Sequence, residues 1–303
     1  MEQTITGENE TKAWKAAGAE SGSVQSAEAT NEDAQTAVSP DRASSAGSAE
    51  SNPWRVVAES VTGASHIRAG IVCQDSHEYR LLEPNLLIAA ISDGAGSASQ
   101  AEVGSKIAVR FSIQTLTDFF ERNLMPEEDE DWKTLMLSAL LAAQRGVEAE
   151  AERLGVALRE LASTLILFVA SPEFAVVAQI GDGAAVLQNA GGEILALTVP
   201  QSGEYLNETL FLVSPRAIEQ AQFGVWRGDV ANVASFSDGL QLLALKLSDG
   251  KPHAPFFTPL FRFLRETEDA EEAKTQLTGF LRSPRITQRA DDDLTLLLAT
   301  RMP

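Results

Sequence analysis

The chain has 303 residues, 44% of them hydrophobic, which is enough apolar material for one substantial core. The sequence contains no run of 18 consecutive apolar residues, so no membrane-spanning helix is predicted, and a single cysteine, Cys73, excludes an internal disulfide framework. The formal net charge of -19 would repel the phosphates of nucleic acids, so a nucleic-acid-binding protein is not expected.

Residues 1–52 form an Ala-, Ser- and Glu-rich segment with very few large apolar side chains, among them Trp14 and Val24. Such a segment cannot bury enough apolar surface to offset the entropy lost on ordering, so we predict a disordered tail. It lacks the apolar stretch of a secretory signal and the Arg-rich, acid-poor balance of a transit peptide. Together with the single cysteine, this favours a cytoplasmic location. The folded domain is predicted to span residues 53–303.

Seven runs rich in β-branched and aliphatic residues follow the tail, and each predicts a strand. Several runs are continuous rather than alternating, which is typical of strands that are covered on both faces. The predicted strands span residues 56–61, 86–91, 164–169, 174–180, 210–213, 230–236 and 294–298.

Helical periodicity is clearest between the second and third predicted strands, where apolar residues recur every three or four positions in residues 103–111 and 136–147. The second of these helices is expected to open near Pro126, because the acidic residues that follow favour the positive end of a helix dipole. A later pair of helices is predicted over residues 257–264 and 273–281. Helices packed against sheets indicate a layered α+β domain.

Three acidic turns, at Asp93, Asp238 and residues 291–293, lie at the edges of apolar runs that predict strands. Any single Asp-Gly pair is usually just a turn, but Asp182 also ends a strongly apolar run, whereas Asp249 does not. An unpaired carboxylate at the exit of a buried strand is costly unless a cation or hydrogen bonds compensate it. Oxygen ligands suit Mg²⁺ or Mn²⁺, so we predict one shared metal site and a metal-dependent phosphoester hydrolase.

Six fragments, in this order along the chain, resemble the metal-dependent serine/threonine protein phosphatases of the type 2C (PPM) family. Each fragment alone is a weak signal, but their order, spacing and apolar flanks match the family over residues 54–300. The resemblance implies a central antiparallel β-sandwich flanked by helices on both sides, a four-layer α-β-β-α fold with the metal site at one end. The fragments are Gln74-Asp75, Ser92-Asp93-Gly94-Ala95-Gly96, Ala162-Ser163-Thr164, Ile180-Gly181-Asp182-Gly183, Phe236-Ser237-Asp238-Gly239-Leu240 and Asp292-Asp293-Leu294-Thr295-Leu296.

The same resemblance implies the metal ligands. Asp93 would bridge two divalent cations, Mg²⁺ or Mn²⁺, and the carbonyl of Gly94 would contribute to the second of them. Asp238 and Asp292 would complete the shell of the first ion. The implied reaction is hydrolysis of phosphoserine or phosphothreonine in a protein by a water that the two ions activate.

Two further aspartates belong to the implied site. Asp75 would lie at the second ion, directly or through a water. Asp182 matches an acidic residue that, in bacterial relatives, helps to hold a third and weaker ion. The implied partner is a phosphorylated protein, so the enzyme would oppose a serine/threonine kinase.

The chain departs from the family pattern at the position whose side chain holds the substrate phosphate. Many relatives place an arginine five residues before the aspartate matched by Asp75, and that position here is Gly70. His66 and Arg68 are the nearest substitutes, as a phosphate contact or as a proton donor. In the eukaryotic branch a histidine in the first turn is a candidate general acid, and here Ala95 replaces it.

The final motif departs as well, because Asp293 replaces the family's asparagine. Asp292 is the expected ligand, since Thr295 then matches the Ser or Thr that begins the family's last strand. A shift by one residue would make Asp291 or Asp293 the ligand instead. The extra carboxylate of Asp293 is expected either to raise metal affinity or to face solvent.

Three functions stay open at this point. The first is an active protein phosphatase, the second a non-catalytic module that holds a phosphoprotein, and the third a metal-dependent phosphatase for a small metabolite. Gly70 and Ala95 motivate the last two. Cys73 lacks the Cys-x5-Arg loop of thiol phosphatases, because position 79 is Tyr79, and it fits a small buried side chain instead. Residues 200–222 are predicted to cover the cleft.

Overall fold

The computed structural model describes residues 53–302, apart from residues 84, 123–124, 202–208 and 247. The predicted tail, residues 1–52, and the middle of the predicted cleft cover therefore lie outside the described residues. The domain boundary near residue 53 stays a prediction. Within the described part of the chain, no helix is both long enough and apolar enough to cross a membrane.

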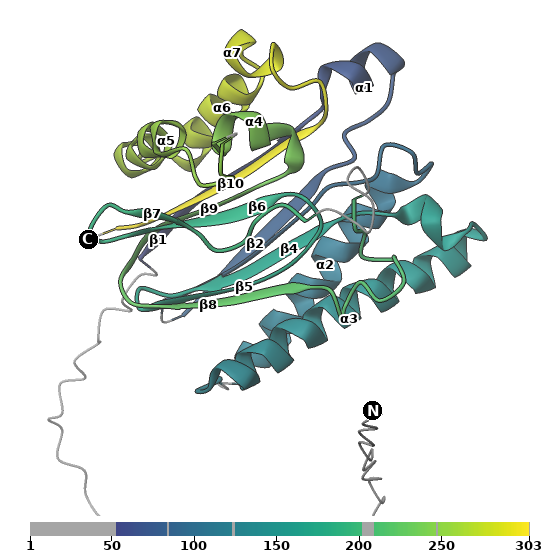
Figure 1. Cartoon of the computed structure of the whole chain (residues 1–303), viewed down its shortest axis with the longest axis horizontal. Helices are drawn as coiled ribbons and strands as arrows, with labels where there is room; N and C mark the ends of the chain where they lie inside the picture. Colours follow the sequence, from purple (N-terminus) through teal and green to yellow (C-terminus); the bar gives the residue numbers. More distant parts are fainter. Residues whose placement is uncertain (1–52, 84, 123–124, 202–208, 247, 303) are drawn as a thin grey trace, which may run out of the picture. The chain divides into compact units, whose positions relative to one another are not determined.

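Two five-stranded sheets form the centre of the domain, and every strand pairing within them is antiparallel (Figure 1). The first sheet contains, in order across it, β1 (Trp54–Val61), β10 (Leu294–Arg301), β9 (Val230–Phe236), β6 (Ala184–Asn189) and β7 (Ile194–Ala196). The second contains β2 (Ser76–Leu82), β3 (Leu86–Ser92), β4 (Leu165–Ala170), β5 (Phe174–Ile180) and β8 (Gln222–Arg227). Six of the seven predicted strands are confirmed, and the strand predicted at residues 210–213 is wrong, because that segment forms turns.

Long helices cover the outer faces of both sheets (Figure 1). The second sheet carries α2 (Ala101–Phe120) and α3 (Asp129–Leu154), and the first carries α5 (Ala254–Glu266) and α6 (Ala270–Leu281). All four correspond to the predicted helices, although α3 begins three residues after Pro126. Shorter helices are α1 (Ala64–Ala69), α4 (Gln241–Ala244) and α7 (Pro284–Thr287), with 3-10 turns at Leu158–Leu161 and Asp238–Leu240.

Three buried apolar clusters hold the four layers together, one between the sheets and one between each sheet and its helices. Strand β3 shows why its sequence is continuously apolar. Its Ile88 and Ala90 pack toward α2 and α3, whereas Leu87 and Ala89 pack toward the other sheet. Because successive side chains point to opposite faces, a strand that is covered twice needs apolar residues at every position. The four-layer fold that the resemblance implied is confirmed.

The strand pairings bring the acidic turns to one end of the sandwich. Strand β9 ends where β6 and β10 begin, because Phe236 pairs with Ala184 and with Leu296. In the other sheet, β3 and β5 both end beside the start of β4. A tight turn at Gly181, whose φ of 117° favours glycine, leads from β5 in one sheet to β6 in the other. The loops that follow β3, β5 and β9 and precede β10 therefore share this end.

Candidate metal centre

A cavity of about 160 Å³ opens at this end, and its walls carry four carboxylates. Asp93 follows β3 and Asp182 follows β5, while Asp238 follows β9 and Asp292 precedes β10. Gly94 also lines the cavity, so the structure brings five of the six predicted ligands to one place. Oxygen donors from four separate turns form the kind of site that binds hard divalent cations.

Asp93 and Asp238 line the same cavity, and each carboxyl group affects the pKa of the other. Burial raises the pKa of Asp93 well above its ordinary value, and the charges of Asp75 and Asp238 add to this effect. Burial also raises the pKa of Asp238, with further contributions from Asp182 and Asp292. Carboxylates crowded in this way resist ionisation together, and a divalent cation is the species that relieves their repulsion.

Asp75, the sixth predicted ligand, lies behind the cavity wall and is only 5% exposed. Its Oδ2 accepts hydrogen bonds of 2.8 Å from the hydroxyls of Ser237 and Thr295. Burial raises the pKa of Asp75 to about 7; these two hydrogen bonds oppose the rise, and the charges of Asp293 and Asp238 add to it.

Two buried carboxylate oxygens at this site, Oδ1 of Asp75 and Oδ1 of Asp238, have no hydrogen-bond partner among the described residues. Buried polar atoms nearly always have a hydrogen-bond partner. An atom without one among the described residues is therefore a candidate for contact with a bound ion. A divalent cation fits this need, because it takes oxygen ligands and offsets the cost of burying negative charge. The donor set therefore fits Mg²⁺ or Mn²⁺.

The backbone around Asp93 is fixed by the neighbouring strand. Its N–H donates to Thr164 Oγ1 at 3.0 Å, and its carbonyl accepts the N–H of Thr164 at 2.8 Å. The next residue, Gly94, allows a close approach, because a Cβ there would lie 2.7 Å from the carbonyl oxygen of Gln74. Asp93 is thus held by Thr164, which directly precedes β4, while Gly94 packs against the segment that leads to Asp75.

Asp182 is held from the opposite wall of the cavity. Its Oδ2 accepts a hydrogen bond of 2.7 Å from Thr209, and its backbone carbonyl accepts one from the side chain of Gln241. Thr209 and Phe211 themselves line the cavity, so the described end of the predicted cover does reach the site. The remainder of that segment, residues 202–208, lies outside the described residues.

The three consecutive aspartates have three different surroundings. Asp292 lines the cavity with a side chain that is 60% exposed. Asp291 does not line it, and its side chain pairs with exposed Arg68 at 3.3 Å. Asp293 does not line it either, and it is buried at 2% exposure, where it accepts hydrogen bonds from two backbone N–H groups. Asp293 therefore does not face solvent, and an effect of its carboxylate on metal affinity stays a prediction.

His66 and Arg68 both lie in α1, and neither lines the cavity. His66 is a nearly buried residue of this short helix. Its Nδ1 lies 2.9 Å from Asp293 Oδ1, and its Nε2 lies 4.0 Å from Asp292 Oδ1. Gly70, at the position of the family's arginine, ends α1 in the left-handed conformation with φ of 70°. The structure thus places His66, but not Arg68, directly beside an aspartate of the cavity.

Ser237, Thr295, Thr209 and Phe211 surround the carboxylates, and sequence reasoning assigned none of them a contact with the site. Ser237 and Thr295 belong to the motifs that contain Asp238 and Asp292, and this proximity in sequence could have indicated that they lie at the site. Thr209 and Phe211 lie in an irregular segment where the apolar run at residues 210–213 predicted a strand, so nothing in the sequence pointed to their contact with the carboxylates.

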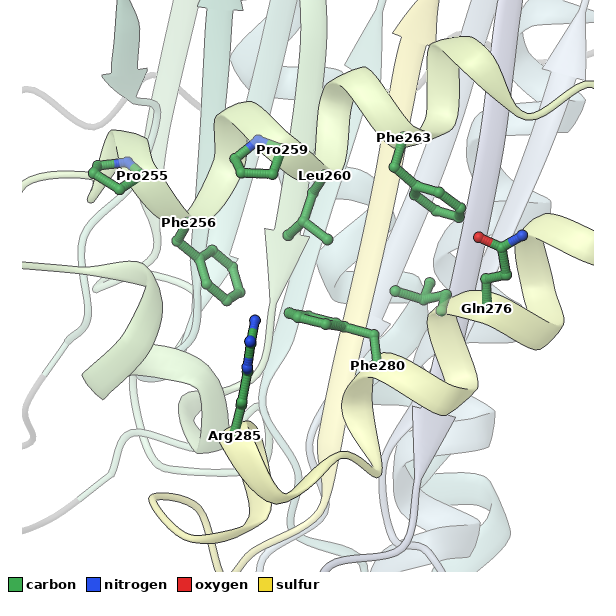
Figure 2. A pocket seen from close by; sticks show the side chains of 9 residues that line it. Pro255, Phe256, Pro259, Leu260, Phe263, Gln276, Phe280 and Arg285 are labelled. Atoms are coloured by element: carbon green, nitrogen blue, oxygen red, sulfur yellow. The ribbon is translucent and has the colours of Figure 1, made fainter.

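A larger cavity of about 400 Å³ lies elsewhere, between α5, α6 and α7 (Figure 2). Phe256 and Leu260 from α5 face Phe280 from α6, and Arg285 from α7 reaches between them (Figure 2). None of the residues that line this cavity carries a carboxylate. It therefore lacks the oxygen ligands that a divalent cation requires, and the smaller acidic cavity is the metal-site candidate.

Residues 62–282 match the family described as "Protein phosphatase 2C". The chain is 36% identical over 252 residues to "Serine/threonine-protein phosphatase 3" of Escherichia coli (strain K12), and this alignment covers 81% of the chain and 98% of that protein.

Solved structures share the fold. The "Serine/threonine phosphatase Stp1" of Staphylococcus aureus superposes with a TM-score of 0.56 at 17% identity, covering 82% of this chain and 95% of its own. The catalytic domain of the serine/threonine protein phosphatase PstP, solved with two manganese ions, gives a TM-score of 0.53 at 16% identity and covers 82% and 99%. At these identities the likeness concerns the fold alone, and it agrees with the four layers described above.

Proposed function

Because the chain belongs to the protein phosphatase 2C family and is a metal-dependent protein serine/threonine phosphatase, we propose that its acidic cavity is the catalytic metal site. The observation that supports this assignment is the meeting of Asp93, Asp182, Asp238 and Asp292 around one cavity. Asp75 adds a buried carboxylate directly behind them. The cofactor is Mg²⁺ or Mn²⁺, in agreement with the donor set and with the two manganese ions of the similar PstP structure.

We propose that Asp93 bridges two ions, with the carbonyl of Gly94 at the second, and that Asp238 and Asp292 complete the first. Asp75 would help to bind the second ion, directly or through a water, and Asp182 would help to bind a third. When bound, these ions supply the acidity that ionises a water and the positive charge that neutralises a phosphoryl group. The residues contribute by holding their carboxylates in place before the substrate arrives, which avoids reorganisation during the reaction.

The family and the relative support a protein substrate. Residues 62–282 match protein phosphatase 2C, and the 36% identical protein is a serine/threonine-protein phosphatase, so the binding-module and metabolite-phosphatase alternatives are not favoured. The cavity of about 160 Å³ has room for a phosphate group. The substrate is phosphoserine or phosphothreonine in a protein, and the enzyme would oppose a serine/threonine kinase in the cytoplasm.

His66 and Arg68 are proposed as auxiliary residues. Arg68 has a largely exposed side chain tied only by the surface pair with Asp291, so it is free to contact a substrate phosphate. His66 is proposed as a proton donor because its Nε2 faces Asp292. Arg68→Ala should then raise KM more than it lowers kcat, whereas His66→Ala should lower kcat.

Phosphate release from phosphoserine and phosphothreonine peptides by the purified full chain tests the proposed function. Release is expected with Mn²⁺, no release is expected in EDTA, and added Mn²⁺ should restore it. Asp93→Asn should be inactive while its far-ultraviolet circular dichroism stays that of wild type. A folded wild type that binds Mn²⁺ without turning over any phosphopeptide would contradict the assignment, and turnover of small phosphates alone would contradict the protein substrate.

A further inference from the structure

Asp293 is a buried carboxylate that the proposed metal chemistry does not use. Only 2% of it is exposed, and it does not line the acidic cavity. Its Oδ1 accepts the backbone N–H of Gly63 at 2.7 Å, and its Oδ2 accepts the backbone N–H of Gln74 at 2.6 Å. His66 Nδ1 lies 2.9 Å from the same Oδ1, which is an ion-pair distance without the geometry of a hydrogen bond. Three groups from two separate segments thus converge on one side chain.

The chemistry of this contact requires a carboxylate. Two backbone donors approach two different oxygens, so the side chain must accept hydrogen bonds at both ends. An asparagine has one acceptor oxygen and one NH₂ group, and the NH₂ group would face one of the N–H donors. A buried N–H without an acceptor is strongly disfavoured. This explains why an aspartate stands where the family pattern has an asparagine.

The donors that Asp293 holds are neighbours of the proposed ligands. Gln74 directly precedes Asp75, and its carbonyl oxygen is fixed in turn by the hydroxyl of Ser105 at 2.6 Å. His66 turns its Nε2 toward Asp292 Oδ1 at 4.0 Å. Asp293 itself follows Asp292 directly in the chain. One buried side chain therefore connects the backbone at Asp75 with the carboxylate of Asp292.

We propose that Asp293 is a positioning residue for the metal site: it holds Gln74 and His66 so that Asp75 and Asp292 stand ready for the cations. Groups that orient metal ligands from behind typically change metal affinity by about 10- to 100-fold when they are mutated. The inference rests on the metal site proposed above. A positioning role can be distinguished from a role of His66 as proton donor alone. Only the positioning role predicts weaker metal binding when no substrate is present.

The test measures Mn²⁺ binding to the full chain by electron paramagnetic resonance of the free ion, with no phosphoester present. Asp293→Asn should weaken Mn²⁺ binding by about 10- to 100-fold, and His66→Ala by about 10-fold. Asp293→Asn should be nearly inactive at low Mn²⁺ and should regain most of the wild-type kcat at saturating Mn²⁺. Asn232→Ala is the matched control: it removes another buried polar group, which bonds Gln188 near the opposite end of β9, and it should bind Mn²⁺ like wild type.

Each outcome is decisive. Wild-type Mn²⁺ affinity in folded Asp293→Asn would overturn the positioning role, as would an equal loss of affinity in Asn232→Ala, because general destabilisation would then explain both. If Asp293→Asn does not fold, His66→Ala decides, and wild-type affinity there overturns the proposal. If the wild-type protein binds no Mn²⁺ at all, the proposed metal site is wrong. If wild type and Asp293→Asn bind Mn²⁺ with equal affinity, only the positioning role is wrong.

Discussion

Ser237 donates a hydrogen bond of 2.8 Å from its hydroxyl to Oδ2 of Asp75, which joins the turn after β9 to the segment before β2. The same hydroxyl oxygen accepts the backbone N–H of Thr295 at 2.9 Å. Ser237 therefore satisfies a buried carboxylate and a buried strand donor at once. This small side chain links three of the segments that form the acidic end of the sandwich.

Replacing Ser237 by alanine should affect both stability and metal binding. The N–H of Thr295 would lose its acceptor, which costs about 1–3 kcal/mol of unfolding free energy. Asp75 would lose one of the two hydrogen bonds that favour its charged form, so its pKa would rise further and Mn²⁺ affinity near neutral pH would fall. Urea unfolding in EDTA and calorimetric Mn²⁺ titration measure the two effects. Ser235→Ala, whose hydroxyl makes only a 3.4 Å contact, is the control and should change both much less.

The stability of the metal-free protein should fall as pH rises. Burial raises the pKa of folded Asp75 to about 7, whereas an unfolded aspartate titrates near 3.9. Between these values the folded state holds a proton that the unfolded state has lost, so protonation stabilises the fold most below pH 4. That stabilisation, on the order of 1–4 kcal/mol, is lost as pH rises toward 7.

Urea unfolding in EDTA from pH 4 to 8 measures this dependence, and Asp75→Asn should flatten it. Added Mn²⁺ should stabilise wild type more at pH 8 than at pH 5, because the cation competes with protons for the same oxygens. A wild-type slope that Asp75→Asn leaves unchanged would show that other groups cause it.

Asp238→Ala should abolish activity without unfolding the protein. Loss of a metal-holding carboxylate removes several kcal/mol of transition-state stabilisation, so phosphopeptide turnover should fall by at least about 100-fold. In EDTA the variant should melt at the same temperature as wild type or higher, since removing one charge relieves the repulsion on Asp93. Most of the wild-type activity surviving in this variant would refute the ligand assignment.

Two glycines of the cavity wall offer a matched pair. A Cβ on Gly94 would lie 2.7 Å from the Gln74 carbonyl oxygen and 2.9 Å from Ala101 Cβ, whereas a Cβ on Gly96 would meet nothing within 4 Å. Gly94→Ala must therefore displace backbone beside Asp93, at about 1–3 kcal/mol and with a loss of activity. Gly96→Ala should stay within about 0.5 kcal/mol of wild type. Thermal unfolding and phosphopeptide assays on both variants check this contrast.

The neighbouring aspartates 291 and 292 should respond differently to the same change. Asp292→Asn should weaken Mn²⁺ binding and lower turnover by at least about 10-fold, because Asp292 lines the cavity. Asp291→Asn should leave both near wild type, since the Asp291 side chain does not line the cavity and forms an exposed pair with Arg68, and such pairs contribute about 0–1 kcal/mol. If Asp291→Asn had the larger effect on Mn²⁺ binding and turnover, Asp291 rather than Asp292 would be the metal ligand.

Most of the fold could be predicted from the sequence because the central strands are covered on both faces. Strands β3, β4 and β5 are continuously apolar, and this pattern is visible without a structure. Four strands were missed. The strands β2, β7 and β8 lie at sheet edges and are polar or short, and the apolar part of the inner strand β6 is limited to Ala184–Leu187. The apolar run at residues 210–213 predicted a strand that does not exist. Its Leu212 is buried against the α2 and α3 layer from a turn, and burial alone does not distinguish a strand from a turn.

The acidic site could be predicted in outline for a similar reason. Asp93, Asp182 and Asp238 follow apolar runs, and the ends of neighbouring strands meet in space. The behaviour of Asp293 could not be predicted, because its burial depends on Gly63, a residue distant in sequence that only the folded chain brings near. His66 likewise belongs to a one-turn helix too short to leave a periodic signal.

The acidic residues come from both halves of the sandwich: Asp93 extends from β3 in one sheet, whereas Asp238 and Asp292 flank β9 and β10 in the other. An ion shared among them would link the two sheets at one end, whereas farther along they are joined by apolar packing and by hydrogen bonds such as Trp54 to Asn85 and Arg301 to Pro172. Removal of the metal should thus destabilise the sandwich at that end first. Proteolytic cleavage and amide hydrogen exchange are then expected at the acidic loops before they appear at the opposite ends of the strands.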